Sequence, residues 1–419
     1  MAPRCRTALS LPARRVAAPN FLRAHRKLLP RATLVNSQQR SFEGSGGWPA
    51  SHAGTRLSPA RDCLVIAQVA PLAESVPPKQ YGGTERVVAY LSEALVAAGH
   101  EVVLFASGDS SARVKLHACC PRALRGQRDV CDPQLWSALQ FQALLDHAAS
   151  FDVIHFHNGY LHFPLREHLP PHLTTLHGRL DFDPPQFYGR YPRAPLVSIS
   201  AAQRKPWPHA AWLRTIHHGL PRGLLHAGPG DGGYLAFVGR ISPEKRVDRA
   251  IEIARRAGLP LKIAAKIDQA DAAYVEQSVR PLLCPPGVEF LGEADERQKQ
   301  ELLAHAAALL FPIDWPEPFG LVMIEALACG TPVIAFAHGS VPEIVEHGRC
   351  GFLVDSVEAA VAAVRRVREI DRGECRRVFE QRFTAERMAA DYVAAYREVL
   401  AERAPLRAQL ATAWEANPS

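Results

Sequence analysis

Residues 308–337 read ALLFPIDWPEPFGLVMIEALACGTPVIAFA. Both ends of this stretch are short apolar runs bounded by turn residues, which is the pattern of buried parallel strands. Between them, Leu321–Cys329 has the apolar spacing of a helix, and Gly320 allows the chain to turn into it. A strand, a helix and a second strand in this order indicate parallel strands joined by a helix. The stretch therefore predicts an α/β protein.

The same alternation extends along the chain in two series. One starts with the apolar run at 64–71 and the other with the run at 234–240, and a stretch rich in Gly and Pro at 217–233 separates them. Two such series predict two facing, Rossmann-like, doubly wound domains with a central cleft, where ligands bind beyond the carboxyl ends of the strands. We expect a disordered basic leader at 1–61, an N-terminal domain at 62–222, a C-terminal domain at 223–384 and a helical segment at 385–419 that packs across both domains or lies on the surface.

The positive charge of the chain is concentrated in the leader. The 419 residues carry a net charge of +7, but residues 1–61 contain eleven Lys and Arg against one acid, Glu43, which leaves the rest of the chain at −3. A mildly acidic body argues against a basic groove, so we expect no nucleic-acid partner. The leader has the composition of an organellar transit peptide, and a misassigned start or a dispensable tail is the interpretation that we favour.

Hydropathy and cysteine use indicate the compartment. No run approaches the about 18–20 uninterrupted apolar residues that a membrane-spanning helix needs, so we expect no transmembrane segment. The nine cysteines are scattered, with no CxxC pair and no metal-ligand spacing, which suits a reducing compartment. We expect a cytoplasmic protein, and peripheral attachment to a membrane stays open.

Cations and glycines follow two of the predicted strands. Gly239 and Arg240 end the run at 234–240, and Lys245 lies in the first turn of a helix expected from Ser242 to Ala257. A close backbone approach together with two cations at a helix start suits a diphosphate. Surface cations on a solvated helix are the alternative.

A glycine pair precedes the first helix of the N-terminal series. Gly82 and Gly83 lie directly before Thr84, which we expect to cap that helix. Free backbone N–H groups at this helix start would also cradle a phosphate. An ordinary turn is the alternative.

Histidines cluster at the ends of the strands expected at 151–157 and 173–178. His155, His157 and His162 could be interpreted as metal ligands, but no acid lies beside them, so we expect no metal site. His177 ends a strand and precedes Gly178, which should place it at the cleft. There a neutral, hydrogen-bonding histidine would contact a ligand.

Two acids, Glu317 and Glu325, flank a glycine turn. Glu317 projects from a loop that Pro316 and Pro318 stiffen. Glu325 lies among apolar residues of the expected helix, where a carboxylate needs a partner such as the hydroxyls of a ligand. Backbone N–H groups at 319–321 would meet a phosphate nearby. Paired carboxylates also serve as acid and base in glycosidases, although a glycosidase would not account for the cations.

These motifs together resemble one enzyme family. EPFGLVMIE at 317–325 resembles the E-x7-E motif of retaining glycosyltransferases with two facing Rossmann-like domains, the GT-B type. FVGRISPEK at 237–245, PPKQYGGTE at 77–85 and TTLHG at 174–178 are similar to companion motifs of glycosyltransferase family 4 as found in bacteria. The resemblance runs from about Leu64 to the C-terminus, and the leader departs from it.

The resemblance implies a role for each matching position. Arg240 and Lys245 would hold the donor diphosphate, which Gly83 approaches from the N-terminal domain. Glu317 would bind hydroxyls of the donor sugar, Glu325 the ribose and His177 the transferred sugar, while the base would rest near Glu293. The expected catalytic residues are thus His177, Arg240, Lys245 and Glu317, and the expected donor-binding residues are Gly82, Gly83, Gly239, Glu293, Phe319, Gly320, Leu321 and Glu325.

The implied function is that of a retaining glycosyltransferase. It would move a hexose from a nucleotide diphosphate-sugar donor to a hydroxyl acceptor, which is a sugar, a lipid-linked sugar or a small molecule. No metal and no cofactor would take part, since the nucleotide sugar is a substrate. A sugar-nucleotide epimerase on the same scaffold and a non-catalytic nucleotide-sugar-binding protein are the alternatives.

Overall fold

The computed structural model describes residues 63–415 apart from 81, 128–129, 131, 185 and 284–285, and for 403–415 it describes the backbone alone. The leader expected at 1–61 lies outside these residues. Within them, no helix is both long and apolar enough to cross a membrane.

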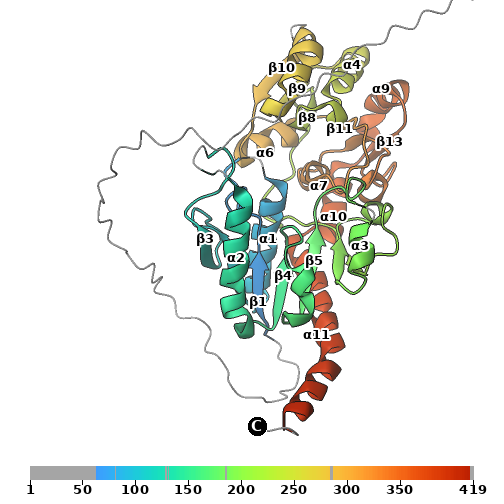
Figure 1. The fold of residues 1–419 in the computed structure, drawn as a ribbon. Coiled ribbons are helices and arrows are strands. Elements are labelled where there is room, and N and C mark those ends of the chain that lie inside the picture. Colours follow the sequence, from blue (N-terminus) through green and yellow to red (C-terminus); the bar gives the residue numbers. More distant parts are fainter. Residues whose placement is uncertain are drawn as a thin grey trace, which may run out of the picture. The chain divides into compact units, whose positions relative to one another are not determined.

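The N-terminal half is built on a seven-stranded parallel sheet (Figure 1). Its strand order is β3-β2-β1-β4-β5-β6-β7, and its central strands are buried on both faces, as their apolar sequences require. The helices of this half are α1 (Gly83–Ala97), α2 (Pro133–His147) and α3 (Gln186–Arg190). The strands are β1 (Val65–Val69), β2 (Glu101–Ser107), β3 (Lys115–Cys120), β4 (Val153–Phe156), β5 (His172–Leu176), β6 (Leu196–Ser198) and β7 (Trp212–Thr215).

The C-terminal half is built on a six-stranded parallel sheet of order β10-β9-β8-β11-β12-β13. Its strands are β8 (Leu235–Arg240), β9 (Leu261–Lys266), β10 (Val288–Gly292), β11 (Ala308–Phe311), β12 (Val333–Phe336) and β13 (Gly351–Val354). Its helices include α4 (Val247–Ala257), α5 (Ala272–Tyr274), α6 (Glu296–His305), α7 (Leu321–Ala328), α8 (Val341–Ile344), α9 (Val357–Arg366) and α10 (Arg372–Arg382).

Both sheets reverse their strand order at one point. The reversal lies between β1 and β4 in the first sheet and between β8 and β11 in the second. Such a switch point opens a crevice beyond the carboxyl ends of the strands. The prediction of two doubly wound α/β sheets is confirmed, and ligands are expected at these two strand ends.

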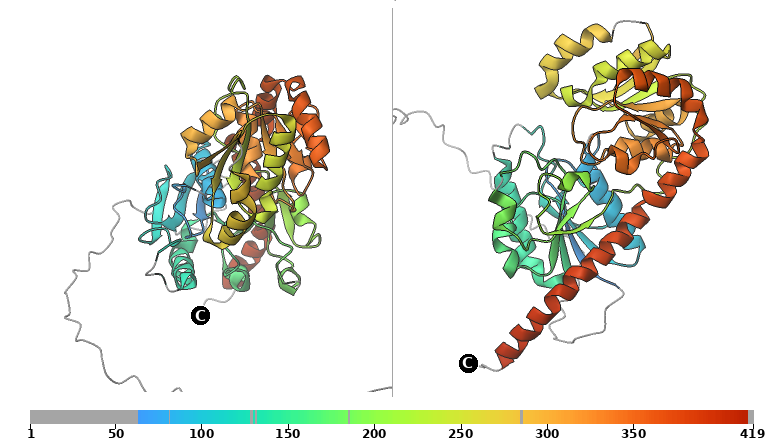
Figure 2. Two further views of the ribbon diagram at one scale, coloured as in Figure 1. Left: turned by 90° about the horizontal axis from the view of Figure 1, so that it is seen from above. Right: turned by 90° about the vertical axis from the view of Figure 1, so that its right-hand side faces the viewer.

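The last helix, α11 (Ala385–Glu415), returns the chain from the second sheet to the first. Figure 2 shows it running back along the N-terminal sheet, where it packs against α1 and β5. It starts beside the linker, because the N–H of Leu220 donates to the carbonyl of Phe383 and the N–H of Ala385 donates to the carbonyl of Leu220. A Cβ added to Gly219 would lie 2.1 Å from the carbonyl oxygen of Thr384, so this crossing needs a glycine.

The helix expected from Ser242 to Ala257 is interrupted. A single 3-10 turn, η4 (Pro243–Lys245), ends at Arg246, which has the left-handed conformation with φ 54°. The expectation of one continuous helix was wrong, because the guanidinium of Arg246 is held by Asp248 at 2.9 Å and by Asp314 at 2.9 Å. A non-glycine residue in this conformation is strained, and such strain is common beside functional groups.

One other local expectation was also wrong, and two edge strands were missed. Thr84 does not cap α1, whose N-cap is Gly82 without any side-chain cap, because the chain packs tightly there: a Cβ on Gly82 would lie 2.7 Å from Pro78. The sequence also favours a helix around Ala270–Leu283, and the structure has a continuous helical segment from Gln269 to Leu282, with 3-10 geometry at both ends and a π-helix at Val275–Val279. The edge strands β3 and β7 were missed, because half-exposed edges lack a continuous apolar run.

Candidate active site

The two switch points share one cleft of about 550 Å³. Every residue that the sequence analysis named as catalytic or donor-binding lines it. Because these residues come from the carboxyl-end loops of both sheets, the cleft is where the fold places a ligand. From the first sheet come Gly82, Gly83 and His177, and from the second come Gly239, Arg240, Lys245, Glu293, Glu317, Phe319, Gly320, Leu321 and Glu325.

Two helix N-termini meet in the cleft. Neither α1 nor α7 has a side-chain cap, and their N-caps are Gly82 and Gly320. Gly320 has φ 82°, and a Cβ there would lie 2.8 Å from Met323, so only glycine fits easily. A Cβ on Gly83 would lie 3.7 Å from the side chain of Leu321, which shows how close the two ends are. Two uncapped N-termini present backbone N–H groups and positive dipole ends to an anion.

Lys245 is held in the cleft by Glu317. The Lys245 ammonium donates to Oε2 of Glu317, and the indole N–H of Trp315 donates to the same oxygen at 2.9 Å. The Lys245 Nζ also lies 4.7 Å from the centre of the Trp315 ring. Glu317 is buried at 8% exposure, and the η4 turn that carries Lys245 is followed directly by Arg246, which donates to Asp248 and Asp314. The ammonium is therefore positioned before any ligand arrives.

Arg240 is surrounded by acids. Its guanidinium donates to Glu244 at 2.5 Å and lies 3.6 Å from Asp268 and 3.8 Å from Asp271. Partial burial raises the pKa of Glu244, but its backbone hydrogen bond, side-chain hydrogen bonds and the Arg240 guanidinium together lower this pKa by more. Glu244 therefore keeps a charge opposite to that of Arg240. An incoming anion would share Arg240 with these acids.

Glu325 has a partner that the sequence analysis missed. Lys299 of α6 donates to Oε1 of Glu325 at 2.5 Å, and both side chains are buried. The same ammonium contacts Glu296 at 3.1 Å, and Glu296 accepts a hydrogen bond from Arg86 of α1. The two halves of the protein are thus joined through these charges at the cleft. The position of Arg86 in the first turn of α1, three residues after Gly83, could have indicated from the sequence that it faces the cleft. No sequence pattern indicated the pairing of Lys299 with Glu325.

His177 stacks on a second histidine that the sequence analysis missed. The rings of His177 and His218 lie 5.3 Å apart and 18° from parallel, and both residues line the cleft. Burial lowers the pKa of His177 to about 3, so the ring is neutral at physiological pH. The ring nitrogens of the neighbouring His155 and His157 contact Gln68, Thr175, Tyr396 and His177, so these nitrogens serve hydrogen bonds.

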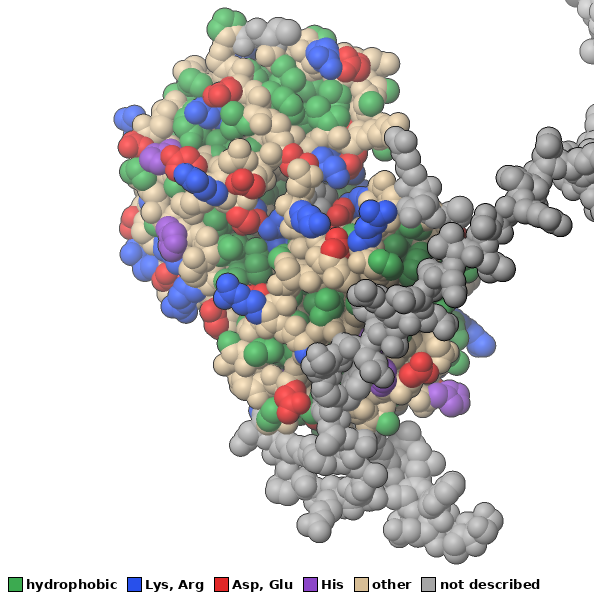
Figure 3. Space-filling view, turned by 90° about the vertical axis from the view of Figure 1, so that its left-hand side faces the viewer, with side chains coloured by type: hydrophobic (Ala, Val, Ile, Leu, Met, Phe, Trp, Pro, Cys, Tyr) green, Lys and Arg blue, Asp and Glu red, His purple; other side chains and the backbone are tan. Residues whose placement is uncertain are grey.

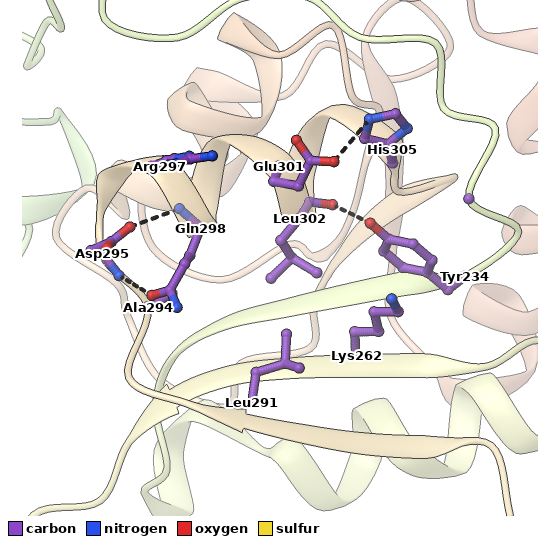
Figure 4. Close-up of a pocket in the computed structure, with 11 residues that line it drawn as sticks. Tyr234, Lys262, Leu291, Ala294, Asp295, Arg297, Gln298, Glu301, Leu302 and His305 are labelled. Atoms are coloured by element: carbon purple, nitrogen blue, oxygen red, sulfur yellow. Dashed lines mark hydrogen bonds and ion pairs between the residues drawn. The ribbon is translucent and has the colours of Figure 1, made fainter.

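A larger cavity, of about 830 Å³, lies between α6 and strands β8–β10 (Figure 4). Several of its polar groups pair with one another: Asp295 and Gln298 cap α6 reciprocally, and the Tyr234 hydroxyl donates to the carbonyl of Leu302 at 2.9 Å. None of the residues named from the sequence lines it. We therefore take the smaller cleft as the candidate site.

Surface charge does not single out another anion site on the face seen in Figure 3. Where side chains of described residues are visible there, Lys and Arg lie among Asp and Glu without a continuous basic stripe. The cations that would bind an anionic ligand are those inside the cleft, which also include Arg86, Arg125, Lys266 and Lys299.

Comparisons with known proteins agree with the fold. The model described as Glycosyltransferase Family 4 matches residues 81–227, and the one described as Glycosyl transferases group 1 matches residues 226–382. The chain is 26% identical over 376 residues to glycogen synthase from Mycobacterium tuberculosis H37Rv, covering 75% of this chain and 89% of that protein.

Solved structures show the same architecture. A glycosyltransferase involved in avilamycin A biosynthesis is 25% identical with a TM-score of 0.62, over 81% of this chain and 98% of that one. An Anabaena protein solved in complex with UDP-glucose is 20% identical with a TM-score of 0.59, over 81% of this chain and 100% of that one, and shares the fold.

The fold and the cleft define a glycosyltransferase of the GT-B type, with two Rossmann-like halves around one site. The chain belongs to glycosyltransferase family 4, and the family resemblance expected from its motifs is confirmed.

Proposed function

We propose that this enzyme is a retaining glycosyltransferase that moves a hexose from a nucleotide diphosphate-sugar to a hydroxyl acceptor without a metal ion. The observation that carries the proposal is the convergence in one cleft of Arg240, Lys245 and the uncapped N-termini of α1 and α7. Fixed cations and two helix dipoles together suit a diphosphate better than any single anion site would.

The other cleft residues fit the rest of such a donor. Glu317 and His177 would contact the sugar, one from each half of the protein, and Glu325 would contact the ribose at the side of Lys299. The base would lie near Glu293. The donor found with the Anabaena fold relative, UDP-glucose, belongs to the class that we propose here.

The experiment that tests this function is a screen of nucleotide sugars by thermal shift, followed by transfer assays with the donors that bind. A donor that binds should raise the melting temperature by mass action and be consumed when a hydroxyl acceptor is added. If no nucleotide diphosphate-sugar shifts the melting temperature at millimolar concentration, the proposal is wrong.

We expect transfer to continue in excess chelator. The acids nearest the expected diphosphate are already paired with cations, Glu317 with Lys245 and Glu244 with Arg240, and these cations can take the charge that a metal takes elsewhere. Initial rates with and without EDTA check this. Loss of activity that manganese or magnesium restores would contradict metal independence.

The new glycosidic bond should keep the anomeric configuration of the donor sugar. This expectation rests on the resemblance of residues 317–325 to the motif of retaining enzymes. A proton spectrum of the fresh product, compared with that of the donor, distinguishes the two anomers by the coupling of the anomeric proton. An inverted product would overturn the retaining mechanism and leave the donor class unaffected.

A further inference from the structure

A chain of buried hydrogen bonds connects His177 in the cleft with helix α11. Nε2 of His177 lies 2.9 Å from Nδ1 of His157, whose Nε2 lies 2.7 Å from Oε1 of Gln68 on β1. The Gln68 amide nitrogen donates to the hydroxyl of Tyr396 on α11 at 3.0 Å. Gln68 and Tyr396 are fully buried and His157 is 5% exposed, so water does not compete for these bonds.

The Gln68 amide determines which group donates in each hydrogen bond of this series. Its nitrogen can only donate, and it donates to Tyr396, so its oxygen faces His157 as an acceptor. Nε2 of His157 must therefore carry a proton. Burial lowers the pKa of His157 well below its usual range, so the ring is neutral and its Nδ1 has no proton. That nitrogen can only accept, and the donor is Nε2–H of His177.

The same logic determines the protonation state of the other ring nitrogen of His177, Nδ1. The ring is neutral, since burial lowers its pKa to about 3, and its one proton is on Nε2. Its Nδ1 is therefore an acceptor, and it is a buried atom with no hydrogen-bond partner among the described residues. A buried acceptor without a partner is unfavourable unless a ligand supplies a donor. His177 lines the cleft, where a sugar hydroxyl would be such a donor.

A second branch of hydrogen bonds starts from the Tyr396 hydroxyl on α11. The hydroxyl of Tyr396 accepts from Gln68 and so donates its proton to Nδ1 of His155, 2.8 Å away. His155 then donates from Nε2 to Thr175 at 2.7 Å, and Thr175 contacts the Tyr392 hydroxyl at 2.9 Å. Tyr392 lies one turn before Tyr396 on α11 but is not on the path to His177. It offers a matched control.

We propose that Gln68, His157 and Tyr396 are positioning residues that hold His177 as its Nε2–H tautomer, so that Nδ1 accepts a hydrogen bond from a hydroxyl of the transferred sugar. The sugar contact rests on the proposed function; the tautomer rests on the hydrogen-bond chain alone. On this inference α11 does more than pack on the N-terminal half: its Tyr396 hydroxyl also helps to hold the tautomer of His177 in the cleft.

The tautomers can be measured on the full-length protein without any ligand. Nitrogen-15 labelling of histidine and long-range proton–nitrogen spectra identify which ring nitrogen carries the proton, and a His177→Gln variant assigns the His177 signals. We expect Nε2–H for His177 and for His157. In Tyr396→Phe the Gln68 amide loses its acceptor and can turn over, so we expect the Nδ1–H form of His177 to become populated. In Tyr392→Phe, which also removes one buried hydroxyl from α11, we expect the wild-type tautomer.

Activity should follow the tautomer. With the donor that the nucleotide-sugar screen identifies, we expect kcat/KM of Tyr396→Phe to fall by about three- to ten-fold, the effect of weakening one hydrogen bond, and that of Tyr392→Phe to stay within two-fold. Gln68→Glu provides a second variant, because a carboxylate accepts from both neighbours, favours a protonated His157 and should place the His177 proton on Nδ1.

The outcomes separate the two proposals. Nδ1–H in wild-type His177, or the same tautomer and the same kcat/KM in all three variants, would overturn the positioning chain in an enzyme that is otherwise active. A wild-type protein that shows the Nε2–H tautomer but binds no nucleotide sugar would overturn the proposed function, and with it the sugar contact.

Discussion

Replacing Lys245 by alanine should lower kcat of glycosyl transfer by roughly 30- to 1,000-fold, which corresponds to about 2–4 kcal/mol of transition-state stabilisation. Negative charge on the β-phosphate grows as the sugar leaves, and the Lys245 ammonium is already fixed by Glu317 and Trp315. A preorganised charge of this kind acts mainly in the transition state, so kcat should fall by more than KM rises. Steady-state kinetics with the identified donor measure this split.

Two control variants accompany this prediction, one outside the cleft and one inside it. Lys262→Ala removes a cation of β9 that packs on Tyr234, 4.4 Å from its ring, and lines the other cavity, so its kcat should be unchanged.

Glu325→Gln should mainly raise the donor KM, because a ribose contact is much the same before and during transfer. Glutamine is preferable to alanine there, since alanine would leave the buried Lys299 without its partner in α7, at a loss of stability of about 3–5 kcal/mol. An unchanged kcat in Lys245→Ala would remove the diphosphate role of this residue.

The sequence was sufficient to predict part of the cleft lining, mainly residues that end a strand or open a helix. Buried parallel strands are readable as apolar runs, and the topology brings their carboxyl ends to one edge. Gly82, Gly320 and His177 were therefore found without any knowledge of the fold in three dimensions. Where a pattern was weak, as at the half-exposed edge strands β3 and β7, no prediction was made.

Pairings between distant residues could not be predicted in the same way. Lys299 and Glu325 are 26 positions apart, and Gln68 and Tyr396 are 328 positions apart. Hydrophobic periodicity shows which face of an element is buried, but it does not show which polar groups meet inside. The expectation that Glu325 needs a partner followed from its apolar surroundings; the identity of Lys299 depended on how α6 packs beside α7.

The stability of the protein should fall steeply below about pH 6.5, the unperturbed pKa of histidine. Five histidines of the N-terminal half are held neutral inside the protein, and burial lowers the pKa of each. The pKa of His177 is lowered to about 3 and the others are shifted well below the usual value; these are His155, His157, His162 and His218.

The sign of this effect follows from proton binding. Below about pH 6.5 the unfolded chain takes up protons at these sites while the native protein does not, so the free energy of unfolding decreases as the pH falls. The stabilisation is fully present above the unfolded pKa and is lost progressively toward the native pKa. Glu85 acts in the opposite direction, because burial raises its pKa, but it is one group against five and acts near the lower pKa of carboxylates.

The pH dependence of the free energy of unfolding should be steep, because the contributions of the five histidines add. Each buried histidine removes up to about 1.4 kcal/mol per pH unit, so the five together approach roughly 7 kcal/mol per unit. A domain stable by about 5–15 kcal/mol would then unfold one to two units below pH 6.5. Urea titrations between pH 8 and pH 5 measure the slope, and a His162→Gln variant, outside the chain that positions His177, should reduce it by about 1.4 kcal/mol per unit whatever its stability at pH 8. A free energy of unfolding that stays constant from pH 7 to pH 5 would mean that these histidines are not held neutral, and the assignment of the His177 proton to Nε2 would fail with it.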